Sequence, residues 1–180
     1  MNPTGLYESV KYGHIDSSKL SSVQRIILAA DGTLTEILEA YSYEKIHVIK
    51  LSEDIISMAQ DIQPLDIKVG RKVIERKILL QGKVSQRNWL FAESILVFDR
   101  LAENFRERLL KSQEPMGKLW TEYKLETFKE IIASYWEQAE DLSDYFKINR
   151  EDKLLCRTYR VFSNHKPIMM ITEKFPASHY

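Results

Sequence analysis

The 180 residues of this chain are enough for one domain with a sizeable core, because a domain of that length buries roughly two-thirds of its unfolded surface. Its 26 basic and 26 acidic residues cancel, so no overall field attracts nucleic acid or an anionic membrane. Hydrophobic residues at 44% and charged residues at 29% exclude the disordered, collagen-like and coiled-coil classes, and the single cysteine excludes a disulfide framework and a cysteine-based zinc site.

The apolar runs of the chain are short. The longest, at 26–30 and 168–171, fall far below the ~20 residues of a membrane-spanning helix. The first 20 residues are polar and charged and lack the apolar core of a secretory signal. We therefore expect a cytoplasmic protein with no membrane insertion and no nucleic-acid partner. We also expect one domain over 1–180, with about 1–20 as a peripheral extension.

The first half of the chain predicts two helices followed by three strands. Helical spacing runs from 18 to 29, and after the Asp31-Gly32 break a second helix is expected over 33–41. Thr33 and Glu36 have capping-box spacing at its start. Residues rich in Ile and Val predict strands at 45–51, 69–80 and 89–98, and the polar turn 81–88 joins the last two as a hairpin.

The second half predicts two helices followed by two strands. Leu101, Phe105 and Leu109 recur at helical spacing, and a second amphipathic helix is expected after the Pro115-Met116-Gly117 break. Its apolar face would carry Leu125, Phe128, Ile132, Tyr135 and Ala139. Strands are expected at 155–162 and 168–175, around the turn 163–167. Helices and hairpins mix without βαβ alternation, which predicts an α+β single domain with a mainly antiparallel sheet.

An arginine interrupts the apolar face of the strand predicted at 69–80. Ile74, Arg76, Ile78 and Leu80 share that face, because alternate side chains of a strand point the same way. A guanidinium removed from water needs an anion, either a protein carboxylate or a bound ligand. Arg76 is therefore either a structural ion-pair residue or a carboxylate anchor.

The last predicted strand contains a matching anomaly. Met169, Ile171, Glu173 and Phe175 share a face, and Glu173 is the one charge in that row. Burial alone raises the pKa of a carboxyl, which would suit a hydrogen-bond donor or proton carrier. The structural alternative is an ion pair with Arg76 or another arginine. Both interpretations require Arg76 and Glu173 to lie in one pocket.

Other chemistries have little support in the sequence. The four histidines are His14, His47, His165 and His179. Their spacing does not match that of metal ligands, so no metal is expected. Ser94 lies in no GxSxG turn, and Cys156 has no recognisable histidine partner, so neither indicates a covalent nucleophile. Glycines do not cluster into a phosphate-binding loop, so no nucleotide cofactor is expected.

Several segments together resemble the chorismate pyruvate-lyase family, also called 4-hydroxybenzoate synthases. The matching pieces are IERKILLQGK with NWLFAES, EPMGKLW with LETFKEI, and the C-terminal KPIMMITEKFPASHY. Their order and spacing agree from about residue 28 to the end. The resemblance implies a chorismate lyase-like domain, with helical flaps over an internal pocket, that releases pyruvate from chorismate to leave 4-hydroxybenzoate without cofactor or metal.

The resemblance also implies the site residues. The arginine that binds the ring carboxylate corresponds to Arg76, and the turn whose backbone helps to hold it corresponds to Met116 and Gly117. The glutamate at the ring hydroxyl corresponds to Glu173, and a flap residue corresponds to Leu34. A buried aromatic product also implies slow release through flaps near 34 and 109–120.

Two departures from the family pattern affect the site. Glu93 stands where the best-known members have an arginine, and this difference would remove a cation near a doubly anionic substrate. The candidates to replace that cation are Arg157, Arg160 and Lys118. The spacing from KP to TE is one residue longer, so Glu173 is equivalent only if a bulge or the turn absorbs the difference.

Two other functions stay open from the sequence. Ligand-sensing domains of some transcription regulators resemble this fold and bind small molecules without turnover, although the residues before the first strand are too few and not basic enough for a DNA-binding region. A lyase acting on a related cyclic carboxylic acid is the other alternative. The pathway that the product feeds and the oligomeric state are not encoded in any recognisable pattern.

Overall fold

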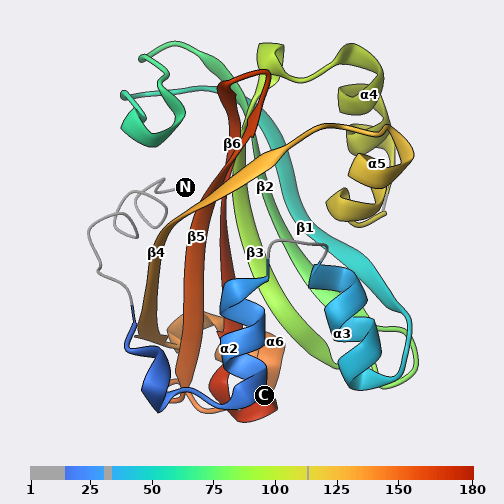
Figure 1. Cartoon of the computed structure of the whole chain (residues 1–180), viewed down its shortest axis with the longest axis vertical. Coiled ribbons are helices and arrows are strands. Elements are labelled where there is room, and N and C mark those ends of the chain that lie inside the picture. Colours follow the sequence, from blue (N-terminus) through green and yellow to red (C-terminus); the bar gives the residue numbers. More distant parts are fainter. Residues whose placement is uncertain (1–14, 31–33, 113) are drawn as a thin grey trace.

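The computed structural model describes residues 15–30, 34–112 and 114–180, and its framework is one antiparallel sheet (Figure 1). The strands are β1 (Ile46–Ser57), β2 (Lys72–Gly82), β3 (Asn88–Val97), β4 (Phe128–Gln138), β5 (Lys153–Ser163) and β6 (Lys166–Pro176). They lie in the order β1-β2-β3-β6-β5-β4, with every neighbouring pair antiparallel. The predicted α+β class with an antiparallel sheet is confirmed.

The helices lie mainly on one face of this sheet. They are α2 (Ser22–Ala29), α3 (Leu34–Ser42), α4 (Glu103–Lys111), α5 (Met116–Glu122) and the short α6 (Ser143–Phe146). In Figure 1, α2 and α3 lie over the lower half of the sheet, and α4 and α5 lie beside its upper half. Each of these four helices places an apolar side chain in the main core: Ile27, Leu38, Phe105 and Leu119, in chain order. Within the described residues, no helix has the length and apolar character to cross a membrane.

Two smaller apolar clusters cover the opposite face of the sheet. One contains Leu65 from the loop between β1 and β2 together with Met170 of β6. The other contains Phe146 of α6 together with Cys156 of β5. With both faces of the central strands covered, their side chains are buried on either side, which holds the strands in a fixed register.

Local signals set the ends of several elements. Helix α2 begins later than expected, after a capping box in which Ser21 and Gln24 satisfy each other's backbone amides. The capping box expected at Thr33 lies outside the described residues. Asn164 and His165 both have positive φ, as a two-residue turn between twisted strands requires, and they connect β5 to β6 as predicted.

The predicted amphipathic helix from Leu125 to Ala139 is wrong. A helix does follow the break at Pro115, but it ends at Glu122, and Phe128–Gln138 is the edge strand β4. The pairing with β5 shifts between Ile131 and Ala133, so Ile132 is an extra residue in the strand. A bulge inserts one residue into the two-residue alternation of a strand. The apolar residues around it then recur at intervals of three or four, which is the spacing expected of an amphipathic helix.

A second bulge explains why β1 was predicted too short. The expected strand ended at Leu51, whereas β1 continues to Ser57. Its register with β2 shifts between Lys50 and Ser52, which leaves Leu51 as the extra residue. The shift interrupts the alternation of apolar side chains, so the second half of the strand carries no clear strand pattern.

Candidate active site

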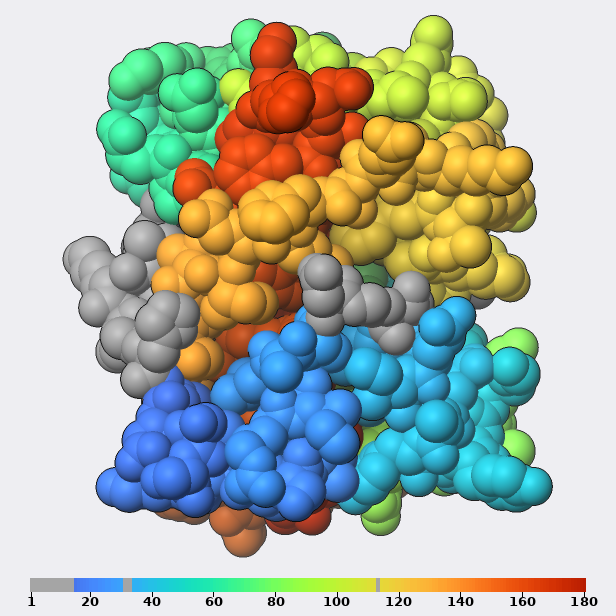
Figure 2. Space-filling model, in the orientation of Figure 1, coloured from blue at the N-terminus to red at the C-terminus, as the bar shows by residue number. Residues whose placement is uncertain are grey.

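A pocket lies between the helical face of the sheet and helices α3 and α5. It encloses about 610 Å³ of atom-free space, its open mouth included. Figure 2 shows a hollow between α5 and α3 on this side of the molecule. A wider groove outside shares Thr35, Pro115 and Gly117 with the pocket, so the two are continuous.

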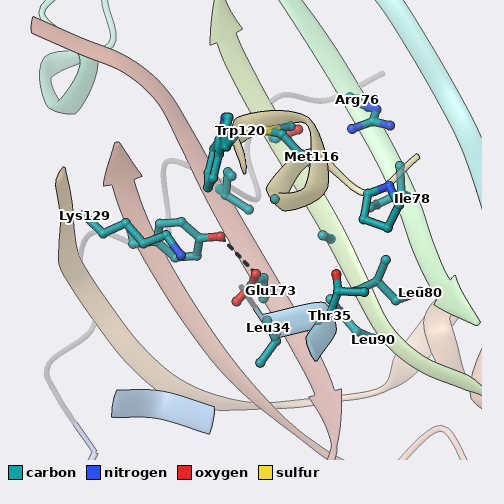
Figure 3. A pocket seen from close by; sticks show the side chains of 16 residues that line it. Leu34, Thr35, Arg76, Ile78, Leu80, Leu90, Met116, Trp120, Lys129 and Glu173 are labelled. Carbon is teal, nitrogen blue, oxygen red and sulfur yellow. Dashed lines mark hydrogen bonds between the residues drawn. The ribbon is translucent and has the colours of Figure 1, made fainter. Parts of the chain in front are cut away.

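All of the site residues predicted from the sequence line this pocket (Figure 3). Arg76 comes from β2, Glu173 from β6, Leu34 from the start of α3, and Met116 and Gly117 from the first turn of α5. Most of the remaining wall is apolar or aromatic: Ile78, Leu80, Leu90, Ala92, Pro115, Trp120, Tyr159 and Ile171. Thr35, Ser94 and Lys129 complete it. This lining suits a partly apolar ligand with a few charged groups.

Arg76 brings an almost fully buried guanidinium to the pocket. Its exposed fraction is 2%, and its Nε lies 2.9 Å from Glu53 Oε2. Its Nη1 and Nη2 atoms are buried and find no hydrogen-bond acceptor among the described residues. Burial lowers the pKa of Arg76, and the Glu53 carboxylate opposes that change. Buried unpaired donors are costly, and a planar fork of two N–H groups matches a ligand carboxylate.

Glu53 connects this arginine to helix α4. Its other carboxylate oxygen lies 2.8 Å from Lys50 Nζ, and the Lys50 ammonium also donates to the backbone carbonyls of Leu109 and Leu110. Cations are favourable at the C-terminal end of a helix, where carbonyl groups lack intrahelical donors. A chain of charges from the end of α4 therefore fixes the position of Arg76. Sequence reasoning missed Glu53 because the predicted strand ended two residues before it.

Glu173 is held as a hydrogen-bond acceptor by two donors on β5. Arg157 Nε lies 2.6 Å from one carboxylate oxygen, and the Tyr159 hydroxyl donates to the other at 3.0 Å, the bond dashed in Figure 3. Burial, with the nearby Glu173 carboxylate, raises the pKa of Tyr159 well above its usual value, so this hydroxyl keeps its proton. The ion-pair partner of Glu173 is thus Arg157, while Arg76 lies in the same pocket.

Arg157 also attaches helix α2 to the site. Its guanidinium is 1% exposed and donates to the backbone carbonyls of Ile27 and Ala30 at the end of α2. The same side chain therefore orients Glu173 and satisfies carbonyls that the helix end leaves open. This arrangement accounts for a buried arginine without any role for Arg157 as a ligand anchor.

The strand register of Glu173 depends on a bulge in β6. Val161 pairs with Met169 and Phe162 with Pro167, which leaves Ile168 as an extra residue. This extra residue lies between KP and TE, where the equivalence of Glu173 requires one, before the strand reaches the pocket. Ile171 and Glu173 then both face the pocket, as the alternation predicts.

The expectation that Glu93 changes the charge of the pocket is wrong. Its neighbours Ala92 and Ser94 line the pocket, so Glu93 points to the other face of β3, where its carboxylate lies 3.4 Å from Lys174 Nζ. Two of the cations proposed in its place also have other partners. Arg160 pairs with Glu130 on the neighbouring strand, and Lys118 pairs with Glu114 at 2.6 Å.

Lys129 is a lining cation that sequence reasoning missed. It extends from β4 into the pocket wall in Figure 3. Its Nζ lies 5.6 Å from the ring centre of Trp120 and 5.2 Å from that of Tyr159. The wrong helix prediction hid it, because only the strand assignment turns Lys129 toward the pocket.

Metal and thiol chemistry have no structural support in the described part of the chain. No group of three histidine, cysteine or acidic side chains there could hold a metal ion. Burial raises the pKa of Cys156 well above its usual value, so the thiolate needed for nucleophilic attack is disfavoured.

Comparison with known proteins places this chain in a family. Residues 28–179 match the family described as Chorismate pyruvate-lyase Rv2949c-like. The chain belongs to this family. All of the predicted site residues of this Rv2949c-like family member lie inside the matched range.

Named relatives agree with this family membership. The chain is 32% identical over 165 residues to a chorismate pyruvate-lyase of Mycobacterium tuberculosis, covering 87% of this chain and 81% of the relative. It is 29% identical over 164 residues to a putative lyase, MJ0807, of Methanocaldococcus jannaschii, covering 87% of this chain and 79% of the relative.

Solved structures share the fold of this Rv2949c-like family member at low identity. The effector domain of PhnF from Mycobacterium smegmatis gives a TM-score of 0.63 at 11% identity, over 82% of this chain and 90% of that domain. The ligand-binding domain of a putative GntR-family regulator from Bordetella bronchiseptica gives 0.54 at 13%, over 73% and 82%. These similarities concern the fold alone.

Proposed function

We propose that this protein is a lyase that converts chorismate into 4-hydroxybenzoate and pyruvate without a cofactor. The observation that carries the proposal is the pair of buried Arg76 Nη1 and Nη2 donors, which lack acceptors among the described residues, in a pocket that also contains the Glu173 carboxylate. A cation and an anion in one apolar pocket suit a ring with a carboxylate at one end and a hydroxyl at the other. The named relatives support this chemistry.

In this proposal, Arg76 anchors the ring carboxylate. Its Nη1 and Nη2 donors would form a bidentate pair with the two carboxylate oxygens. The backbone amides of Met116 and Gly117 open helix α5, where amides lack intrahelical acceptors, and would add donors to the same carboxylate. Replacing Arg76 by alanine should then remove about 2 to 5 kcal/mol of binding free energy.

Glu173 would position the ring hydroxyl. The donors Arg157 and Tyr159 leave its oxygens as acceptors, and an accepting carboxylate holds the hydroxyl proton and polarises the carbon that carries it. In the reaction, that carbon loses its hydrogen as a proton, and the electron pair completes the aromatic ring. The neighbouring carbon–oxygen bond breaks, and the enolpyruvyl group leaves and gains a proton to become pyruvate.

Because aromatisation supplies much of the driving force, the protein needs to orient the substrate more than to activate it. A pocket closed by the start of α3 and the first turn of α5 would hold the ring in one orientation and exclude water. Leu34 and Met116 would form the two sides of this cover.

Ligand binding without turnover is the second candidate function. The effector and ligand-binding domains among the solved structures with this fold favour it. A lyase acting on another cyclic carboxylic acid has lost its main support, because Glu93 faces away from the pocket.

One experiment separates the candidates. The purified protein is incubated with chorismate, without metal or nucleotide, beside an Arg76→Ala variant and a control without protein, and both products are quantified. Equal amounts of 4-hydroxybenzoate and pyruvate, lost in the variant, are expected. Binding of 4-hydroxybenzoate without any turnover of chorismate would refute the lyase and favour the binding function.

A further inference from the structure

We infer that Lys129 binds the second carboxylate of the substrate, the one on the enolpyruvyl group, and so distinguishes substrate from product. The inference rests on the proposed function and names a residue that the site described so far does not use. Apart from Arg76, Lys129 is the one basic side chain that lines the pocket in the described part of the chain.

The path of β4 brings Lys129 over the pocket. The strand starts near α5 (Figure 1) and pairs with β5 from its first residue, so it runs beside the strand that carries Tyr159. Lys129 pairs with Val161, which lies two residues from Tyr159 and shares its face of β5, so Lys129 is on the pocket side of the sheet. Its ammonium approaches the rings of Trp120 and Tyr159. Two aromatic faces within ~6 Å of a cation hold it in place at this wall.

The order of polar groups across the site matches their order on the substrate. Arg76 is on β2, Glu173 two strands further on β6, and Tyr159 on the next strand, with Lys129 beside it. Neighbouring strands are ~4.8 Å apart, so Arg76 and Glu173 are separated on the scale of a ring with groups at its opposite ends.

The enolpyruvyl group is attached to the ring carbon next to the one that bears the hydroxyl. With the ring carboxylate at Arg76 and the hydroxyl at Glu173, this group extends from the hydroxyl end of the ring, where the Tyr159 hydroxyl meets Glu173. When the ring is oriented with this group toward β5, its carboxylate reaches the side of the pocket on which Lys129 lies. An ammonium on a flexible stem can follow a carboxylate that moves as the carbon–oxygen bond breaks.

The product carries the ring carboxylate and the hydroxyl, but not the second carboxylate. Arg76 and Glu173 would therefore bind substrate and product alike, whereas Lys129 would add affinity for the substrate alone. Loss of Lys129 should therefore weaken binding of the substrate but not of the product. Loss of a lysine with a merely structural role would not separate the two affinities.

The test compares KM for chorismate with the inhibition constant of 4-hydroxybenzoate in wild type, Lys129→Met and Lys129→Arg. We expect Lys129→Met to raise KM about 10- to 100-fold, the range for losing one charge-assisted pair, with the inhibition constant changed less than about threefold. Lys129→Arg should recover most of the loss. The matched control is Lys153→Met, since Lys153 is an exposed lysine on β5 that lines neither the pocket nor the groove outside it, and this variant should leave KM unchanged.

Each result has a distinct meaning. No turnover by the wild type would overturn the proposed function and this inference with it. Turnover with an unchanged KM in Lys129→Met would overturn the inference alone. So would an inhibition constant for 4-hydroxybenzoate that rises as much as KM does, or an equal rise of KM in Lys153→Met. Thermal unfolding of each variant reports its folding, and Lys129→Gln replaces Lys129→Met if the latter is unfolded.

Discussion

Arg76 and Glu173 line one pocket, yet they form ion pairs with other residues and not with each other. Arg76 Nε lies 2.9 Å from a carboxylate oxygen of Glu53, and Glu173 Oε2 lies 2.6 Å from Arg157 Nε. Two opposite charges in a shared apolar pocket would otherwise attract each other and close the space between them. Separate partners keep the cation and the anion apart, so both can face a ligand.

A lysine at position 76 should not replace the arginine. Arg76→Lys keeps the positive charge but loses the planar fork that matches a carboxylate, so the affinity for 4-hydroxybenzoate should fall at least about tenfold. Calorimetric titration measures the affinity, and thermal unfolding checks that the variant is folded. An affinity within twofold of the wild type would contradict bidentate anchoring.

Removing the partner of Arg76 should reduce stability. Glu53→Gln leaves a buried guanidinium without its anion, which should lower the free energy of unfolding by about 3 kcal/mol. Urea unfolding measures the change. Asp54→Asn is the matched control, because Asp54 is exposed on the same strand, and it should change stability by less than about 0.5 kcal/mol. Equal effects of the two substitutions would argue against the ion pair.

The hydroxyl of Tyr159 should matter for the reaction more than for the fold. Tyr159→Phe removes the 3.0 Å bond to Glu173 while keeping the ring, so kcat/KM for chorismate should fall about tenfold with about 1 kcal/mol lost in stability. The raised pKa of Tyr159 keeps the hydroxyl protonated, so the loss should be constant between about pH 6 and 9. A loss that varies with pH in that range would contradict a neutral donor. Tyr145→Phe, at an exposed tyrosine, is the control.

Glu44 should make stability depend on pH far from the pocket. Its carboxylate accepts hydrogen bonds from the Ser85 hydroxyl and from the amides of Ser85 and Val84, which lower its pKa from 4.5 to about 2. A lowered folded-state pKa stabilises the fold above the unfolded value and loses that contribution as pH falls through the folded one. The stability difference between wild type and Glu44→Gln should be full above pH 4.5 and absent near pH 2. Unfolding curves at several pH values test this, and a constant difference would refute it.

Product release should limit turnover. Because α3 and α5 cover the pocket and the product keeps the groups that would bind Arg76 and Glu173, 4-hydroxybenzoate should inhibit competitively. Rapid mixing with chorismate should give a burst of about one product molecule per site before the steady state. Linear product formation from the start would place the slow step before release.

Sequence reasoning located the two charges of the pocket because each interrupts an apolar row on a regular strand. Arg76 lies among Ile74, Ile78 and Leu80, and Glu173 follows Ile171, so period-two alternation was enough to find them. The family resemblance added Leu34, Met116 and Gly117, which no periodicity marks.

The residues that sequence reasoning missed lie on irregular strands. Glu53 follows the bulge at Leu51, and Lys129 precedes the bulge at Ile132, so simple alternation gave the wrong boundary for one strand and the wrong element for the other. A bulge is stabilised by the partner strand and by packing, and neither is visible in the local sequence. The contacts between Arg157 and the end of α2 likewise join residues about 130 positions apart.

The central position of β6 has a consequence for how the protein is made. Residues 166–176 are translated after the other five strands of the sheet, yet they join β3 to β5 in the middle of it. Until they leave the ribosome, β1–β3 and β4–β5 have no strand between them, and the wall that carries Glu173 does not exist. The nascent chain therefore exposes the unpaired edges of β3 and β5 until β6 has emerged. A stop codon shortly before residue 166 would divide the sheet into β1–β3 and β4–β5, whereas loss of an edge strand would leave the other strands paired.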